Sequence, residues 1–190
     1  MGNQVQMIRT PYSMDDLRVM LTNVFFERNN RLPTSGELAG MLAMIHLENA
    51  GGSSIWNNNV GNTIVFDETR DYWMAEGNPR KFASFMGIDL GLKRFVDTLH
   101  RPQNIRILEA AKVGDFDAFF AGIHTPHPTL KSAYCPDCGG ESARSTYKKL
   151  FSQYGGVVEN YKSSKPGFIM GTITLLIVGG ITIATLRKKR

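Results

Sequence analysis

Glu48 is an acidic residue at the edge of an apolar helical pattern. At 3.6 residues per turn it falls at the border of the face that Leu38, Leu42 and Ile45 form. A carboxyl group at such a border is partly removed from water, which raises its pKa, and the negative end of the helix dipole acts in the same direction. A protonated carboxyl facing a cleft suits glycosidic bond cleavage, because the leaving oxygen must receive a proton. The same pattern also fits an ordinary glutamate at a fraying helix end.

Both cysteines of the chain lie in one short motif, residues 135–138 (CPDC). Two histidines lie just upstream, so that the four candidate metal ligands are His124, His127, Cys135 and Cys138. These side chains are of the types that bind zinc, and a structural zinc site is one interpretation. A Cys135–Cys138 disulfide is a second interpretation, natural in an oxidising compartment, and two free thiols are a third. Because the chain contains no second motif of this two-cysteine kind, a standard zinc ribbon is excluded.

Composition and charge limit the class of protein. The chain has 190 residues, of which 42% are hydrophobic and 21% charged, as in an ordinary globular protein. A mainly disordered, collagen-like or multi-span membrane protein is therefore excluded. Five of the 22 basic residues lie at 165 and 187–190, and the remaining 17 balance the 17 acidic residues. The excess charge thus belongs to the C-terminal end, and we expect no nucleic-acid partner.

The elements that must position Glu48 are mostly helices. Ser13 is a candidate N-cap for the first helix, and Thr34 with Glu37 forms a capping box for the second, which would end near Gly51. Residues 51–80 are rich in Gly, Asn and Ser, with β-prone runs at 63–66 and 71–74 that predict a small hairpin. Helical spacing resumes at 88–99, 105–113, 116–123 and 147–154. We expect a mainly α domain over residues 1–154, of α+β type, with a small β or loop lobe and a cleft beside it.

The C-terminal end has the pattern of a membrane anchor. Residues 155–165 form a polar linker, residues 166–186 contain no charged side chain, and residues 187–190 are all basic. Such a stretch is long enough to cross a bilayer as one helix. A buried core helix is the alternative. We expect a single-pass, C-terminally anchored membrane protein with the lipid bilayer as a partner.

Residues 47–53 (LENAGGS) and 56–62 (WNNNVGN) resemble the catalytic segment of the lysozyme-like superfamily. The resemblance is strongest to lytic transglycosylases and to bacterial and phage N-acetylglucosaminidases, in which a helix ends in an essential glutamate. Residues 82–85 (FASF) with Gly91, and Tyr134 with residues 147–150 (YKKL), resemble later parts of the family pattern more loosely. The family often has Ser or Thr after the glutamate, where this chain has Asn49, and residues 135–145 resemble an insertion after Tyr134.

The resemblance implies roles for particular residues. Glu48 would be the general acid, and Tyr134 an auxiliary hydrogen-bond donor near the bond that is cleaved. The strip comprising Asn57, Asn58, Asn59, Gly61 and Asn62 would shape the floor of the cleft and hold sugar groups. An ordinary turn and a packing tyrosine are the alternatives. No cofactor would be needed for catalysis, and any zinc would be structural.

The reaction depends on whether a second carboxylate lies near Glu48. A two-carboxylate N-acetylglucosaminidase would use one of the four acidic side chains of the lobe, which are Asp67, Glu68, Asp71 and Glu76. A lytic transglycosylase works with a single glutamate and gives a 1,6-anhydro product. We favour the transglycosylase, because no lobe carboxylate lies in a recognisable setting.

The resemblance and the anchor together predict a biological setting. A membrane-tethered enzyme that cuts peptidoglycan glycan strands would suit the virion of a tailless, membrane-containing bacteriophage, where it would open the cell wall during infection. Other membrane or capsid proteins of the virion would then be its partners, and a bacterial envelope enzyme is the alternative source. The rival class is a non-catalytic membrane or capsid-associated protein with a lysozyme-like fold.

Overall fold

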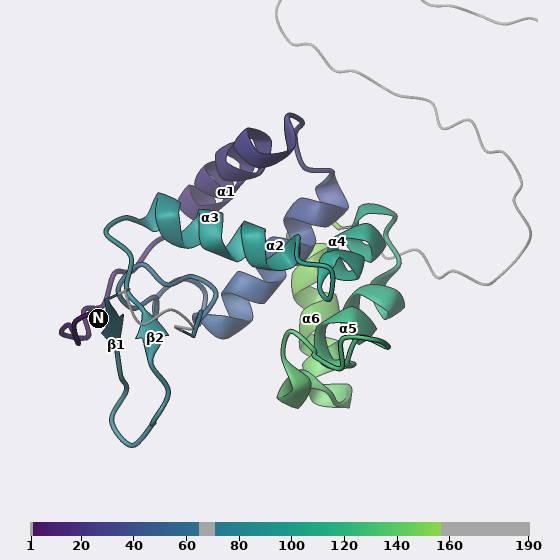
Figure 1. Cartoon of the computed structure of the whole chain (residues 1–190). Coiled ribbons are helices and arrows are strands. Elements are labelled where there is room, and N and C mark those ends of the chain that lie inside the picture. The colour runs from purple at the N-terminus through teal and green to yellow at the C-terminus, as the bar shows by residue number, and fades with distance from the viewer. Residues whose placement is uncertain (1, 65–70, 157–190) are drawn as a thin grey trace, which may run out of the picture. The chain divides into compact units, whose positions relative to one another are not determined.

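The computed structural model describes residues 2–64 and 71–156, and its secondary structure is mainly helical (Figure 1). These residues belong to one compact unit, Met1–Asn160. The described elements are α1 (Met14–Asn29), α2 (Ser35–Glu48), β1 (Tyr72–Trp73), β2 (Phe82–Ala83), α3 (Ile88–Leu99), α4 (Ile105–Lys112), α5 (Phe116–His124), the 3₁₀ turn η1 (Pro136–Cys138) and α6 (Glu141–Gln153). The predicted mainly α class is thereby confirmed.

The first two helices begin at the predicted caps. The Ser13 side chain accepts a hydrogen bond from the Asp16 backbone N–H, so it supplies a partner for a donor that the helix itself leaves unpaired. Thr34 and Glu37 form the complete capping box at the start of α2. α2 ends at Glu48, three residues before the predicted end at Gly51, because Ala50 and Gly51 adopt positive φ angles that no helix accommodates.

Helix α2 is the central element of the domain and packs against α1, α4 and α6. Its packing against α4 is close, since a Cβ atom at Gly36 would lie 1.9 Å from the Ala111 carbonyl oxygen. The helix is buried on nearly all sides, at Gly36, Glu37, Ala39, Gly40, Met41, Leu42, Ala43, Met44 and Ile45. A helix enclosed in this way has little freedom to move, so it holds the residue at its C-terminus in a fixed position.

The small lobe follows α2, as expected, but its hairpin uses different strands. Residues 71–74 were predicted to pair with 63–66, whereas β1 pairs antiparallel with β2, in the register Tyr72↔Ala83 and Trp73↔Phe82. The chain reverses between these strands at Gly77, whose φ is +72°, and at the following Asn78-Pro79. Ile64 makes only an isolated bridge to Phe82. Residues 65–70 lie outside the described part of the chain.

Helix α6 begins six residues earlier than predicted. Its first two turns are polar and carry no apolar repeat, so helical spacing in the sequence revealed only its buried second half, with Tyr147, Leu150 and Phe151. Helices α3, α4 and α5 match their predicted ranges to within one residue.

No helix in residues 2–64 and 71–156 is long and apolar enough to cross a membrane. The predicted span at 166–186 and the basic residues 187–190 lie outside the described residues, as does most of the predicted linker at 155–165.

Candidate active site

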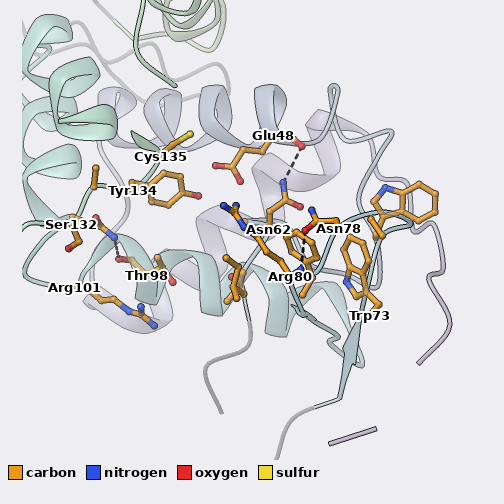
Figure 2. A pocket seen from close by; sticks show the side chains of 18 of the residues that line it. Glu48, Asn62, Trp73, Asn78, Arg80, Thr98, Arg101, Ser132, Tyr134 and Cys135 are labelled. Carbon is orange, nitrogen blue, oxygen red and sulfur yellow. Dashed lines mark hydrogen bonds between the residues drawn. The ribbon is translucent and has the colours of Figure 1, made fainter. Parts of the chain in front are cut away.

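Glu48 is the last residue of α2 and faces a pocket of about 680 Å³ (Figure 2). Its side chain is half-buried, and its Oε2 atom is closed to solvent without a hydrogen-bond partner. Burial raises the pKa of Glu48 to about 7, and Tyr134 opposes this with a smaller effect. No arginine or lysine of the described residues forms an ion pair with Glu48. The carboxyl is therefore partly protonated at neutral pH.

Tyr134 lies beside Glu48 in the wall of the pocket, and Figure 2 shows the two side chains directed toward each other. Its interaction with Glu48 lowers the pKa of the carboxyl, yet the buried tyrosine hydroxyl has no hydrogen-bond partner of ordinary geometry. Burial and the nearby carboxyl hold the pKa of Tyr134 well above its usual range. The hydroxyl thus stays protonated and can donate a hydrogen bond.

The predicted residues Gly61 and Asn62 also line the pocket, and Asn62 is fixed against Glu48. Its Nδ2 atom donates to the Glu48 backbone carbonyl at 3.3 Å (Figure 2). That carbonyl is one of those that the end of a helix leaves unpaired, so Asn62 supplies it with a partner. This hydrogen bond connects the predicted strip to the C-terminal end of α2.

Asn57, Asn58 and Asn59 use their side chains within the protein. Asn57 accepts from the Ile8 backbone N–H at 2.8 Å, and Asn58 donates to the Phe85 carbonyl at 3.0 Å. Asn59 is 1% exposed and makes three such bonds, one to Ala83 and two to Thr63. None of the three is among the described residues that line the pocket. Their hydrogen bonds instead hold segments of the lobe together. Their predicted contact with sugar stays a prediction.

Asn49, at the place where the resembled family often has Ser or Thr, is fully buried. Its Nδ2 atom donates to the carbonyls of Ile45 at 3.1 Å and Val60 at 2.6 Å. A serine hydroxyl has one hydrogen to donate and could not make both bonds. Asn49, the residue that follows Glu48, thus joins the end of α2 to Val60, which lies within the strip.

Helix α3 packs closely against the strip. A Cβ atom at Gly91 would lie 1.8 Å from the Asn58 carbonyl oxygen, so only glycine permits this approach. A Cβ at Gly61 would lie 2.9 Å from the Phe95 ring.

Several lining residues were not found from the sequence. They are three aromatic residues, two arginines and a set of amide and hydroxyl side chains: Trp56, Trp73, Phe82, Arg80, Arg101, Asn78, Thr98, Gln103, Asn104 and Ser132. Arg80 and Arg101 each adjoin a proline in a turn, but no spacing connects them with Glu48. Trp73 Nε1 and Asn104 Oδ1 are buried without hydrogen-bond partners, as are Glu48 Oε2 and the Tyr134 hydroxyl. A bound molecule with several polar groups would match such a wall.

Among the described residues that line the pocket, Glu48 has the only carboxyl group. Asp71 and Glu76 are exposed and do not line it, and Asp71 accepts a hydrogen bond from the Asn3 backbone N–H at 2.9 Å. The other two candidates for a second carboxylate, Asp67 and Glu68, lie outside the described residues.

The two cysteines form a disulfide, Cys135–Cys138, which is the second of the three interpretations. His124 instead hydrogen-bonds the Phe120 carbonyl through Nδ1, and His127 Nδ1 contacts Thr129. Within residues 2–64 and 71–156 there is no group of three or more His, Cys, Asp or Glu side chains that could hold a metal ion. The structure therefore does not bring the four predicted zinc ligands together, and zinc binding itself stays a prediction for metal analysis.

No protein-family model, curated protein or solved structure matches this chain. The candidate site therefore rests on its own residues and geometry.

Proposed function

We propose that this protein cleaves the glycan strands of peptidoglycan as a lytic transglycosylase, with Glu48 as its general acid and base. The observation that carries the proposal is the unpaired Glu48 carboxyl, whose pKa is raised to about 7 at the wall of a 680 Å³ pocket. A group with a pKa near the working pH can both give and take a proton. The resemblance of residues 47–62 to the lysozyme-like superfamily supports the same reading.

The reaction has two proton transfers and consumes no water. Protonated Glu48 donates its proton to the glycosidic oxygen as the bond from that oxygen to C1 breaks. The 6-hydroxyl oxygen of the same sugar then bonds to C1 and gives its proton to the Glu48 carboxylate, which restores the starting state. The product ends in a 1,6-anhydro sugar. Tyr134, held neutral beside Glu48, would donate a hydrogen bond near the reacting oxygens.

The absence of a second carboxyl from the described lining favours this route over a two-carboxylate N-acetylglucosaminidase. In the hydrolase alternative, an acidic side chain of the lobe would activate water or attack C1. Its products would carry reducing ends and be one water molecule heavier than the anhydro products, so mass spectrometry of the products distinguishes the two reactions.

The test of catalysis compares the full chain with Glu48→Gln on peptidoglycan, by zymogram and by turbidity of cell-wall suspensions. Glu27→Gln is the matched control, because Glu27 is an exposed glutamate on α1. We expect Glu48→Gln to lower activity about a hundredfold or more, the usual scale for a general acid, and Glu27→Gln to leave it unchanged. Equal clearing by wild type and Glu48→Gln would remove Glu48 from the mechanism. Binding of glycan without clearing by any variant would favour the non-catalytic alternative.

We further propose that residues 166–186 tether the enzyme to a bilayer, in the virion of a membrane-containing bacteriophage or in a bacterial envelope. The tether would hold the pocket at a high effective concentration beside the wall. Support for this comes from the uncharged stretch and its flanking basic residues.

A further inference from the structure

The guanidinium groups of two arginines of the pocket, Arg80 and Arg101, have no hydrogen-bond or ion-pair partner within the described part of the chain. Arg80 lies between β1 and β2, and Arg101 lies in the turn between α3 and α4. The ion pairs of the described residues instead involve Arg28, Arg31 and Arg144. In Figure 2, Arg80 and Arg101 lie on segments across the pocket from the end of α2, with Arg101 at its edge beside Thr98.

The two arginines give the pocket a local positive charge. The domain as a whole does not explain it, since basic and acidic residues balance over 1–164. The only carboxyl of the described lining is that of Glu48. Arg80 is exposed and Arg101 half-buried, so an anion in solution can reach both guanidinium groups, and two such groups lining one concave pocket create a field that attracts anions. The two parallel N–H donors of arginine match a carboxylate or a phosphate, and on the peptidoglycan strand of the proposed function the anionic groups are carboxylates.

The surroundings of Arg101 are suited to a polar ligand. Thr98 and Ser132 lie near it and away from Trp73, as Figure 2 shows. Asn104 belongs to the same turn and is 4% exposed, with its Nδ2 donating to the Thr98 carbonyl and its Oδ1 left without a partner. The pocket therefore has an aromatic end near Trp73 and a polar, cationic end near Arg101.

We propose that Arg80 and Arg101 bind carboxylate groups of the substrate, so that the pocket selects an acidic glycan strand over a neutral one of the same backbone. This inference rests on the proposed function and adds the determinant of its specificity. In a peptidoglycan strand the carboxylates come from the stem peptide or, where the peptide has been removed, from the lactyl group of the sugar. Neutral chitin oligosaccharides have neither.

The experiment measures kcat and KM for the full chain and for Arg80→Gln and Arg101→Gln. The substrates are intact strands, strands freed of peptide by an amidase, and intact strands whose carboxyls have been converted to amides. We expect each substitution to raise KM about tenfold on carboxylated strands, with little change in kcat, and to have no effect on amidated strands. Arg80→Lys and Arg101→Lys should recover part of the affinity, because they keep the charge and lose the paired donors.

Lys148→Gln is the matched control, since Lys148 is exposed on α6 and its loss removes one positive charge outside the pocket. It should leave KM unchanged. Thermal unfolding of each variant separates loss of binding from loss of fold. A preference for intact over peptide-free strands would assign the carboxylate to the stem peptide, and the reverse would assign it to the lactyl group. Equal KM values on carboxylated and amidated strands would overturn the inference.

A binding measurement keeps the inference separate from the proposed function. Calorimetric titration of Glu48→Gln with carboxylated and amidated strands reports affinity without turnover. Tighter binding of carboxylated strands that is lost in Arg80→Gln and Arg101→Gln supports the inference even if the wild type cleaves nothing, in which case only the proposed reaction fails. Cleavage without any carboxylate preference overturns the inference and leaves the reaction in place.

Discussion

Glu37 and Glu48 lie at opposite ends of helix α2, and their surroundings shift the pKa values of their carboxyl groups in opposite directions. Burial alone would raise the pKa of Glu37, but hydrogen bonds from Arg31 and Thr34 outweigh burial and keep that pKa below its usual value. The Arg31 guanidinium reaches both carboxyl oxygens, at 2.6 and 2.8 Å. Glu48 has no such cation, and burial raises its pKa to about 7. One helix thus carries an ion-paired carboxylate at its start and, at its end, a carboxyl that is partly protonated at neutral pH.

If Glu48 is the general acid, as proposed, activity should fall as the pH rises above about 7, because its carboxyl then loses its proton. The contact with Tyr134 lowers the pKa of Glu48, so removing the hydroxyl in Tyr134→Phe should raise that pKa and move the alkaline limb to higher pH. The variant should also turn over more slowly, about tenfold, through loss of a donor. Profiles of kcat/KM against pH for both proteins test this. An alkaline limb that stays in place would separate Tyr134 from the titration of Glu48.

Glu48→Gln should stabilise the protein at alkaline pH. The folded pKa of Glu48 is about 7 against an ordinary 4.5, so between these values the native state binds more protons than the unfolded chain. The free energy of unfolding of the wild type therefore falls as pH rises through this window, by up to about 3 kcal/mol. Glutamine removes this dependence. Urea unfolding of both proteins at about pH 5 and about pH 8.5 measures the stability difference between them at each pH. An equal increase in the stability of Glu48→Gln at both pH values would contradict this prediction.

Two asparagines of the predicted strip should respond differently to substitution. Asn59→Ala removes three hydrogen bonds of a buried side chain and should lower the free energy of unfolding by roughly 3 kcal/mol. Asn62→Gly keeps the positive φ of 44° available and removes the bond to the Glu48 carbonyl, so it should lower kcat about tenfold with a small effect on stability. Unfolding curves and kinetics of both variants check the contrast. A variant Asn62→Gly with wild-type kcat would show that this bond does not position Glu48.

The Cys135–Cys138 disulfide should be detectable as the absence of free thiols. Alkylation of the denatured, unreduced protein followed by mass spectrometry should add no label, and metal analysis should find no zinc. Because Cys135 follows Tyr134 directly and lines the pocket, reduction should lower activity severalfold while affecting global stability little, as expected for so small a loop. Stoichiometric zinc with both thiols free in the metal-stripped protein would instead support the site at His124, His127, Cys135 and Cys138.

The full chain should float with liposomes in a density gradient if residues 166–186 span a bilayer. Leu176 and Val178 lie near the middle of this stretch, where each arginine would cost roughly 3 kcal/mol. The double variant Leu176→Arg, Val178→Arg should therefore remain in the dense fractions. Lys188→Gln, a change in the terminal basic residues, serves as the control and should still float. Flotation of the arginine variant would place membrane binding elsewhere in the chain.

The sequence predicted best those features that depend on near neighbours. The caps at Ser13 and Thr34 and the apolar spacing of α3 are local signals, and each matches the structure. Pairing of β1 with β2 was missed because it depends on the turn at Gly77, while the first two turns of α6 have no apolar repeat to mark them. In the site, Glu48, Gly61, Asn62 and Tyr134 were predicted and do line the pocket.

The arginines and Trp73 could not be predicted, because only tertiary packing brings them to Glu48. The different surroundings of the asparagines in the strip could not be predicted either. Asn59 and Asn62 are three residues apart and of one type, yet the first is closed in by Thr63 and Ala83 and the second faces the pocket. A side chain's hydrogen-bond partners depend on segments that the local pattern does not contain.

The pocket draws its walls from stretches of chain as distant as Met7, Glu48, Arg101 and Cys135. During synthesis on a ribosome, Glu48 emerges long before Tyr134, which lies beside it in the folded protein. A nascent or prematurely released chain that stops before residue 134 therefore lacks a complete pocket, and the proposed cleavage would have to wait until synthesis has passed this residue.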